Sequence, residues 1–188
     1  MRIRSFKIVA VVGLAGAGKS VVTDAFIRKG WAKVRFGDVT DAELRQRNLP
    51  VNEKNERSVR EELRRRHGMA AYAILNRPRI DRLLKSGNVV VDGLYSWEEY
   101  KLLKRAYGDR LLIAAVYAPP ALRYSRLAQR KVRPLSLEEA AGRDFAEIER
   151  INKGGPIAMA DITLLNVKGK RVLAGAVRSI LRLLALER

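Results

Sequence analysis

Residues 8–20 limit the possible folds of this chain more than any other segment. They begin with a short apolar run, Ile8-Val-Ala-Val-Val12, and continue directly into Gly13-Leu-Ala-Gly-Ala-Gly-Lys-Ser20. The second part matches the pattern G-x-x-x-x-G-K-[ST] in full. Glycines in this pattern let successive backbone N–H groups face one anionic centre, and the helix that follows adds its positive end. The sequence therefore predicts a buried strand, a phosphate-binding loop and a helix, in that order.

Each residue of this loop has an expected role in binding ATP. The backbone holds the phosphates, Lys19 reaches the β- and γ-phosphates as a catalytic residue, and the Ser20 hydroxyl is a ligand for Mg²⁺. A chance match in a chain of this size has a probability below about one in a hundred. The alternative is a glycine-rich turn without a function. The predicted cofactor-binding residues are Gly13, Leu14, Ala15, Gly16, Ala17, Gly18, Lys19 and Ser20.

Apolar runs alternate with helix-favouring segments along the rest of the chain. Strands are expected at 7–12, 32–36, 88–91, 111–117 and 162–165. Helices are expected at 19–29, 96–106, 120–130, 136–151 and 171–186, with a loop at 152–156. Residues 40–85 are charged and helix-favouring, with breaks expected near Pro50, Gly68 and Pro78. The alternation predicts an α/β fold with a five-stranded parallel sheet and helices on both faces. Ligands bind such sheets at the carboxyl ends of the strands.

An aspartate and a glycine, Asp92-Gly93, follow the third of these strands. A carboxylate at this place is expected to hold Mg²⁺, usually through water, although it could instead cap the next turn. Phosphate-loop enzymes that hydrolyse ATP to drive motion often carry glutamate after this aspartate, where it orients the attacking water. Gly93 therefore favours phosphoryl transfer over hydrolysis.

Further candidates follow the second and fourth strands. Arg123, Arg126 and Arg130 are spaced three and four residues apart, so they share one face of a helix. Either Arg126 or Arg130 is predicted to contact the transferring phosphoryl group, and their spacing does not decide which; the alternative is a solvated basic face. Asp38 is predicted to face the acceptor, where it would accept a proton or orient a hydroxyl. A helix N-cap is an equal alternative for Asp38.

Composition limits the class of protein and its surroundings. The chain of 188 residues has the length of one domain, and its lack of cysteine is consistent with a reducing cytoplasm. Its apolar stretches are too short to span a membrane, so a cytoplasmic location without a membrane partner is expected. The formal net charge of +18 leaves a nucleic-acid partner open.

These motifs resemble the P-loop nucleoside monophosphate kinase superfamily. The C-terminal part is most similar to dephospho-coenzyme A kinases: a basic break, a helix running into Ala160-Asp161, a strand, then Asn166 and a last helix. Gly37-Asp38 together with Asp92-Gly93 also resembles little-characterised adenylate-kinase-like proteins.

The resemblance implies a three-layer P-loop NTPase fold in a single kinase-like domain, 1–188. Its core would be 1–38 and 86–188, with a helical acceptor-binding insert at about 40–85 and an arginine-bearing lid at about 126–135.

One departure from the resemblance leaves the acceptor open. Adenylate kinases carry Asp-Gly-Phe-Pro-Arg after the third strand, and that arginine grips the acceptor phosphate. This chain has Asp92-Gly93-Leu94-Tyr95-Ser96 instead. The leading hypothesis is an ATP- and Mg²⁺-dependent kinase acting on a small, nucleotide-like acceptor such as a nucleoside monophosphate. Dephospho-coenzyme A is the alternative acceptor, and a nucleic-acid-associated NTP-binding protein is the rival from another class. Oligomeric state and the choice between ATP and GTP stay open.

Overall fold

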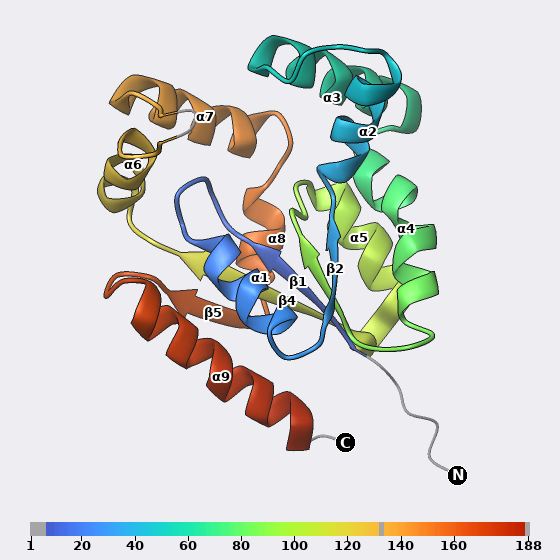
Figure 1. Ribbon diagram of the computed structural model, residues 1–188, viewed down its shortest axis with the longest axis vertical. Coiled ribbons are helices and arrows are strands. Elements are labelled where there is room, and N and C mark those ends of the chain that lie inside the picture. Colours follow the sequence, from blue (N-terminus) through green and yellow to red (C-terminus); the bar gives the residue numbers. More distant parts are fainter. Residues whose placement is uncertain (1–6, 132–133, 187–188) are drawn as a thin grey trace.

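The structure, a computed structural model, describes residues 7–131 and 134–186, which alternate strands with helices (Figure 1). The strands are β1 (Ile8–Val12), β2 (Ala32–Arg35), β3 (Val89–Asp92), β4 (Leu111–Tyr117) and β5 (Ile162–Leu165). The α-helices before β4 are α1 (Lys19–Ile27), α2 (Asp38–Gln46), α3 (Glu53–His67), α4 (Ala71–Leu83) and α5 (Trp97–Tyr107), followed by a 3₁₀ turn, Gly108–Arg110. The later helices are α6 (Pro120–Ala128), α7 (Leu137–Glu149), α8 (Gly154–Ala158) and α9 (Lys170–Leu186).

The strands form one five-stranded sheet in the order β2-β3-β1-β4-β5. Every neighbouring pair is parallel, which confirms the predicted α/β fold. The central strand β1 lies between β3 and β4, and Val11 of β1 is in register with Asp92 of β3. The predicted phosphate loop therefore leaves the middle of the sheet, and Asp92 lies on the adjacent strand.

Helices cover both faces of the sheet, and β1 shows how its residues divide between the two faces. Ile8, Ala10 and Val12 pack into a core cluster shared with α3, α4 and α5. Val9 and Val11 pack into the opposite cluster with α1 and α9. Because side chains alternate along a strand, a strand covered on both faces is apolar at every position.

No helix in the described part of the chain has the length and apolar character needed to cross a membrane.

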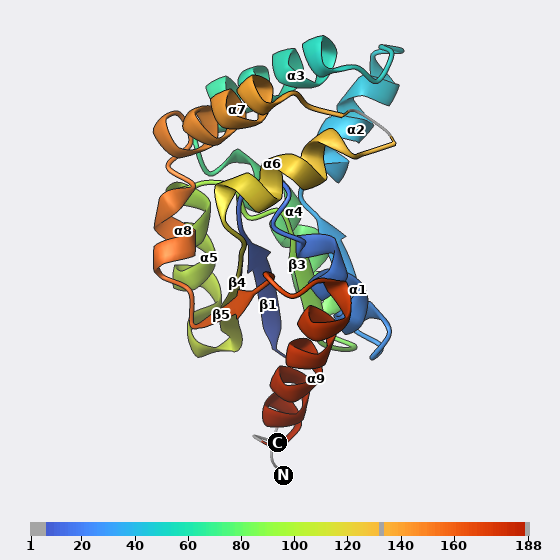
Figure 2. The same ribbon diagram turned by 90° about the vertical axis from the view of Figure 1, so that its left-hand side faces the viewer.

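Two helical segments extend beyond the carboxyl ends of the strands. In Figure 1, α2 and α3 lie at the upper right, and α6 and α7 lie at the upper left. Figure 2 shows the same segments above the sheet after a quarter turn. They lie on the side of the sheet where the phosphate loop leaves β1.

Two details of the predicted elements were wrong. Pro78 does not break the helix but lies inside α4. It is exposed, as is Ile74 one turn earlier, so water can satisfy the carbonyl that the proline ring leaves unbonded. Residues 152–156, expected to be a loop, include the start of α8. Proline is well placed in the first turn of such a short helix, and Pro156 is buried there.

Candidate active site

The loop between β1 and α1 is tightly wrapped because its three glycines adopt positive φ angles. These angles are 139° at Gly13, 78° at Gly16 and 105° at Gly18. A Cβ atom on Gly13 would lie 2.4 Å from the carbonyl oxygen of Val116 on β4. A Cβ atom on Gly18 would lie 2.3 Å from Asn166 Nδ2. Glycine is therefore required both for the backbone conformation and for the space around the loop.

Lys19, the first residue of α1, folds its side chain back over this loop. Its Nζ donates hydrogen bonds to the carbonyl oxygens of Gly13 at 2.8 Å and Leu14 at 3.1 Å. Burial, and after it the charge of Lys153, lowers the pKa of Lys19 to about 7. A polyphosphate brought next to this ammonium would favour its charged form. The geometry therefore suits the predicted role of Lys19 toward phosphates.

The two predicted magnesium ligands lie on neighbouring elements. Asp92 ends β3, and its Oδ2 forms an ion pair with Lys33 Nζ at 3.2 Å. Ser20 lies in the first turn of α1 and is exposed. A hydroxyl and a carboxylate are hard oxygen donors, so both residues fit Mg²⁺. Within residues 7–131 and 134–186, no group of three or more His, Cys, Asp or Glu could hold a metal. The remaining ligands would therefore be phosphate oxygens and water.

Asp38 lies shortly after β2, and its carboxylate pairs with two arginines. It is the first residue of α2, and Gly37 occupies the N-cap position. Its Oδ1 lies 3.2 Å from Arg35 Nη1, and its Oδ2 lies 2.8 Å from Arg79 Nη1. Because β3 separates β2 from β1, the ends of those two strands are about 10 Å apart. The two arginines therefore orient the Asp38 carboxylate, which lies at the start of α2 on the β2 side of the phosphate loop.

The two candidate arginines beyond β4 have different surroundings. Arg126 is half-buried and donates from Nη2 to the Asn166 carbonyl at 2.9 Å, with Nη1 3.5 Å from the Gly16 carbonyl. Arg130 lies just beyond the end of α6 and is largely, but not fully, exposed. Partial burial and the charge of Arg143 lower the pKa of Arg130. Of the predicted lid at about 126–135, residues 132 and 133 lie outside the described residues.

Arg123, the third arginine of that helix face, is buried against the loop. It is 3% exposed and forms a forked ion pair with Asp144 of α7, with N–O distances of 2.9 and 2.5 Å. The guanidinium also donates to the carbonyl oxygens of Ala118 at 3.0 Å and Ala15 at 3.1 Å. It ties α6 and α7 to the phosphate loop, which spacing along the sequence did not indicate.

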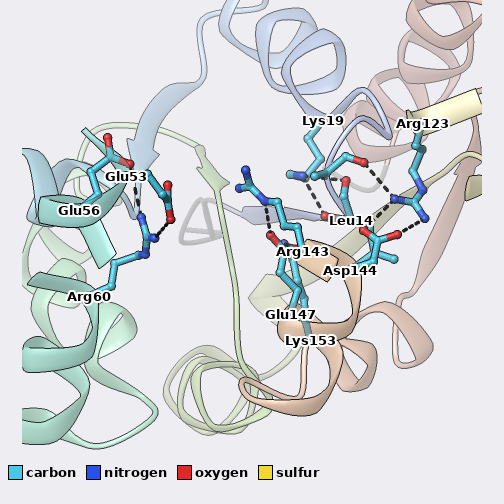
Figure 3. A network of polar contacts seen from close by, with 12 residues as sticks. Leu14, Lys19, Glu53, Glu56, Arg60, Arg123, Arg143, Asp144, Glu147 and Lys153 are labelled. Atoms are coloured by element: carbon cyan, nitrogen blue, oxygen red, sulfur yellow. Dashed lines mark hydrogen bonds and ion pairs between the residues drawn. The ribbon is translucent and has the colours of Figure 1, made fainter. Parts of the chain in front are cut away.

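A second buried lysine lies near the loop, and no motif of the sequence indicated it. Lys153 is 2% exposed, and its Nζ donates to Glu147 Oε2 at 2.6 Å. Arg143 Nε donates to the other oxygen of Glu147 at 3.2 Å. Burial alone would raise the pKa of Glu147, but the charge and hydrogen bond of Lys153 outweigh it and lower the value to about 2. Figure 3 shows Arg143, Glu147 and Lys153 gathered next to Lys19.

The turn after β3 is closed by Tyr95. A Cβ atom on Gly93 would lie 2.6 Å from the Tyr95 hydroxyl, so the tyrosine packs directly on the glycine. Glu99 holds this turn, accepting from the backbone N–H groups of Tyr95 at 2.7 Å and Ser96 at 3.2 Å. Burial raises the pKa of Glu99 to about 7. Gly93 therefore leaves room for a tyrosine, and a glutamate at this position would displace it.

Comparison with known proteins identifies relatives along most of the chain. Residues 9–148 match the family described as AAA domain. A UPF0200 protein from Thermococcus gammatolerans is 37% identical over 163 residues, covering 85% of this chain and 85% of that protein. A UPF0200/UPF0201 protein from Archaeoglobus fulgidus is 35% identical over 182 residues, covering 95% of this chain and 56% of that protein.

Several solved structures with the same architecture are named as kinases. A shikimate kinase from Bacteroides thetaiotaomicron superposes with a TM-score of 0.60 at 16% identity, covering 95% of this chain and 98% of its own. A gluconokinase from Sinorhizobium meliloti 1021 superposes with a TM-score of 0.54 at 13% identity, covering 98% and 99%. At such low identity the likeness establishes the fold alone, which is the P-loop kinase-like fold.

Proposed function

This chain belongs to the AAA-domain family and to the UPF0200 proteins, and from that premise we propose that it is an ATP- and Mg²⁺-dependent small-molecule kinase. The observation that carries the proposal is the complete phosphate loop, with Lys19 folded over it, Asp92 at the end of the adjacent strand and Gly93 directly after it. In the proposal the loop amides and Lys19 bind the donor phosphates. The predicted single domain, 1–188, then contains both the donor and the acceptor side.

Mg²⁺ would be held by Ser20 directly and by Asp92 through water. When bound, the ion neutralises charge on the β- and γ-phosphates. Asp92 is kept in direction by its ion pair with Lys33. Arg126 is the better placed of the two candidate arginines, because it already contacts the loop at the Gly16 carbonyl. Arg130 is the one that closure of the predicted lid would bring to the phosphates.

The reaction transfers one phosphoryl group. The bond between the γ-phosphorus and the β–γ bridging oxygen breaks, and its electron pair leaves with ADP. A new bond forms between the γ-phosphorus and an acceptor oxygen, and a hydroxyl acceptor loses its proton to solvent. Asp38, fixed by Arg35 and Arg79, orients that acceptor. Positioning and charge stabilisation supply most of the rate in such transfers.

The acceptor in this proposal is a small molecule, and a nucleotide-like acceptor is preferred. The superposed kinases named for shikimate and gluconate support a small acceptor. The resemblance of the C-terminal part, including Asn166 after β5, to dephospho-coenzyme A kinases supports dephospho-coenzyme A as the alternative. The missing arginine after Gly93 removes the usual grip on a nucleoside monophosphate, so the acceptor has to be found by experiment.

The test is an acceptor panel with labelled ATP and Mg²⁺. It contains nucleosides, nucleoside monophosphates, dephospho-coenzyme A, shikimate and gluconate. We expect at least one acceptor to be phosphorylated, and the Lys19→Ala variant to lower the rate by about 100-fold or more. The matched control is Lys29→Ala, which removes an exposed lysine just after α1. Tight ATP binding without any phosphorylated acceptor would count against the kinase proposal.

A further inference from the structure

Lys153, in the connection from α7 to α8, is a charged residue that is buried next to the site. Its ammonium is almost fully buried, with Glu147 Oε2 at 2.6 Å and the ring centre of Tyr95 at 5.4 Å. An ammonium has three N–H donors. Among the described residues, Glu147 supplies the one oxygen within hydrogen-bond distance. The ammonium is thus held in place by one carboxylate and one aromatic face, with donors to spare.

Lys153 lies between the donor and the acceptor sides of the site. On the donor side, the charge of Lys153 lowers the pKa of Lys19, and no other charged group changes that pKa as much. The Nζ of Lys19 in turn rests on the phosphate loop. On the other side, it faces Tyr95, which packs on Gly93 after β3. A phosphoryl group passing from the loop to an acceptor beyond Gly93 would therefore pass close to this ammonium.

Stability does not account for a lysine at this position. Removing an ammonium from water costs several kcal/mol, and apolar replacements of buried ion pairs are often neutral or stabilising. Glu147 also has a second cation, Arg143, on its other oxygen. The Glu147 carboxylate would therefore keep one cationic partner without Lys153. Neutralising the charge of Glu147 is thus not a sufficient reason for a lysine at position 153.

We propose that Lys153 donates hydrogen bonds to the phosphoryl group during its transfer, with Glu147 as the positioning residue that holds the ammonium between Lys19 and Tyr95. This inference rests on the proposed kinase function and adds a catalytic residue to it. A fixed cation at the place where charge develops stabilises the transition state more than the bound ground state. The bonds that form and break are those of the transfer described above, and Lys153 gains and loses no proton in it.

The experiment compares the affinity of the full chain for Mg²⁺·ADP with and without aluminium fluoride, which imitates the phosphoryl group in flight. The wild type is expected to bind more tightly when aluminium fluoride is present. Lys153→Met should remove most of that gain, so its affinity for Mg²⁺·ADP with aluminium fluoride should be about 100-fold lower than that of the wild type. Its Kd for Mg²⁺·ADP alone should change by less than about threefold. Lys153→Arg keeps the charge and should retain most of the gain.

A matched control and a stability control accompany these variants. Lys101→Met removes another lysine that lies near a glutamate and an aromatic ring, 4.0 Å from Glu98 and 5.9 Å from the ring centre of Trp97, but on α5. It should keep the wild-type gain. The double variant with Lys153→Met and Glu147→Leu removes both members of the pair. It should fold and still lack the gain, which separates a folding defect from a lost contact.

The inference is overturned if Lys153→Met keeps the full gain, or if the wild type shows no gain at all. It is also overturned if Lys153→Met weakens Mg²⁺·ADP binding as much as aluminium fluoride binding. The outcome is separate from that of the acceptor panel. A panel without products would remove the kinase function and leave a Lys153-dependent gain standing. A phosphorylated acceptor together with a Lys153→Met variant that keeps the full gain would support the kinase function and overturn the role of Lys153.

Discussion

Glycines with positive φ angles, inside and outside the phosphate loop, differ in what an added methyl group would meet. At Gly13 the nearest atom is a backbone carbonyl oxygen of β4, 2.4 Å from the added Cβ. At Gly30, which also has a positive φ of 81°, nothing lies within 4 Å. The two positions therefore separate the cost of backbone conformation from the cost of steric overlap.

We expect Gly13→Ala to lower the free energy of unfolding by about 3 kcal/mol and to abolish ATP binding, because β4 cannot move away without disturbing the sheet. Gly30→Ala carries only the conformational cost, about 1 kcal/mol, and should bind ATP normally. Urea denaturation and nucleotide titration measure the two effects. Equal destabilisation of both variants would show that contact with Val116 is not what fixes glycine at position 13.

At the scale of elements, a buried ion pair between Arg123 and Asp144 joins α6 to α7, and Arg123 also donates to the phosphate loop at the Ala15 carbonyl. Removing one member of such a pair leaves an unpaired buried charge, which costs about 3–5 kcal/mol. We expect Arg123→Leu to lose stability of this size and the double variant with Asp144→Leu to recover most of it. The Ala15 carbonyl still lacks its donor in the double variant, so ATP affinity should recover less than stability.

Denaturant unfolding and ATP titration of the two variants test this prediction. If the double variant is as unstable as the single one, the hydrogen bonds of Arg123 to Ala15 and Ala118 matter more than its charge pair. The control is Arg143→Leu, which removes a half-exposed arginine of α7 whose partner, Glu147, keeps Lys153. It should cost little stability.

Elements with a strong local pattern were predictable from the sequence. Strands buried on both faces are apolar throughout, and Ser96 with Glu99 forms the capping box that starts α5. Pro78 misled because the signal for a break is local, whereas exposure of one helix face is decided by tertiary packing. The start of α8 was missed because five residues carry too little periodicity to indicate a helix.

The candidate site was predictable only where one short segment specifies it. Residues 13–20 form such a segment, and the glycine pattern determines the loop geometry. Lys153, Glu147 and Arg123 reach the loop from other elements, and nothing in their own spacing links them to it. Long-range pairing of this kind follows from packing, which single-sequence periodicity does not record.

At the scale of the whole molecule, the net charge of +18 makes nucleic acid the main rival ligand. Many arginines already pair with carboxylates, as Arg47 does with Glu43 and Glu62. The kinase proposal therefore predicts little oligonucleotide binding near physiological ionic strength, with a Kd weaker than about 10 μM. The nucleic-acid-associated function predicts binding that weakens steeply with added salt. A salt titration against duplex and single-stranded oligonucleotides, with and without ATP, measures this. Submicromolar binding at physiological salt would favour the nucleic-acid-associated function.

The sheet topology separates the phosphate loop, which follows β1, from the segment between β2 and β3 that is proposed to bind the acceptor. The phosphate loop lies between β1 and α1 and is contacted from α6, whereas α2, α3 and α4 all belong to the connection between β2 and β3. Substitutions in that connection do not alter the chain that wraps the phosphates. On the proposal that residues 40–85 bind the acceptor, substitutions there can change the acceptor while residues 13–20 keep their contacts with the nucleotide. Relatives with the same glycine-rich loop need not share a substrate.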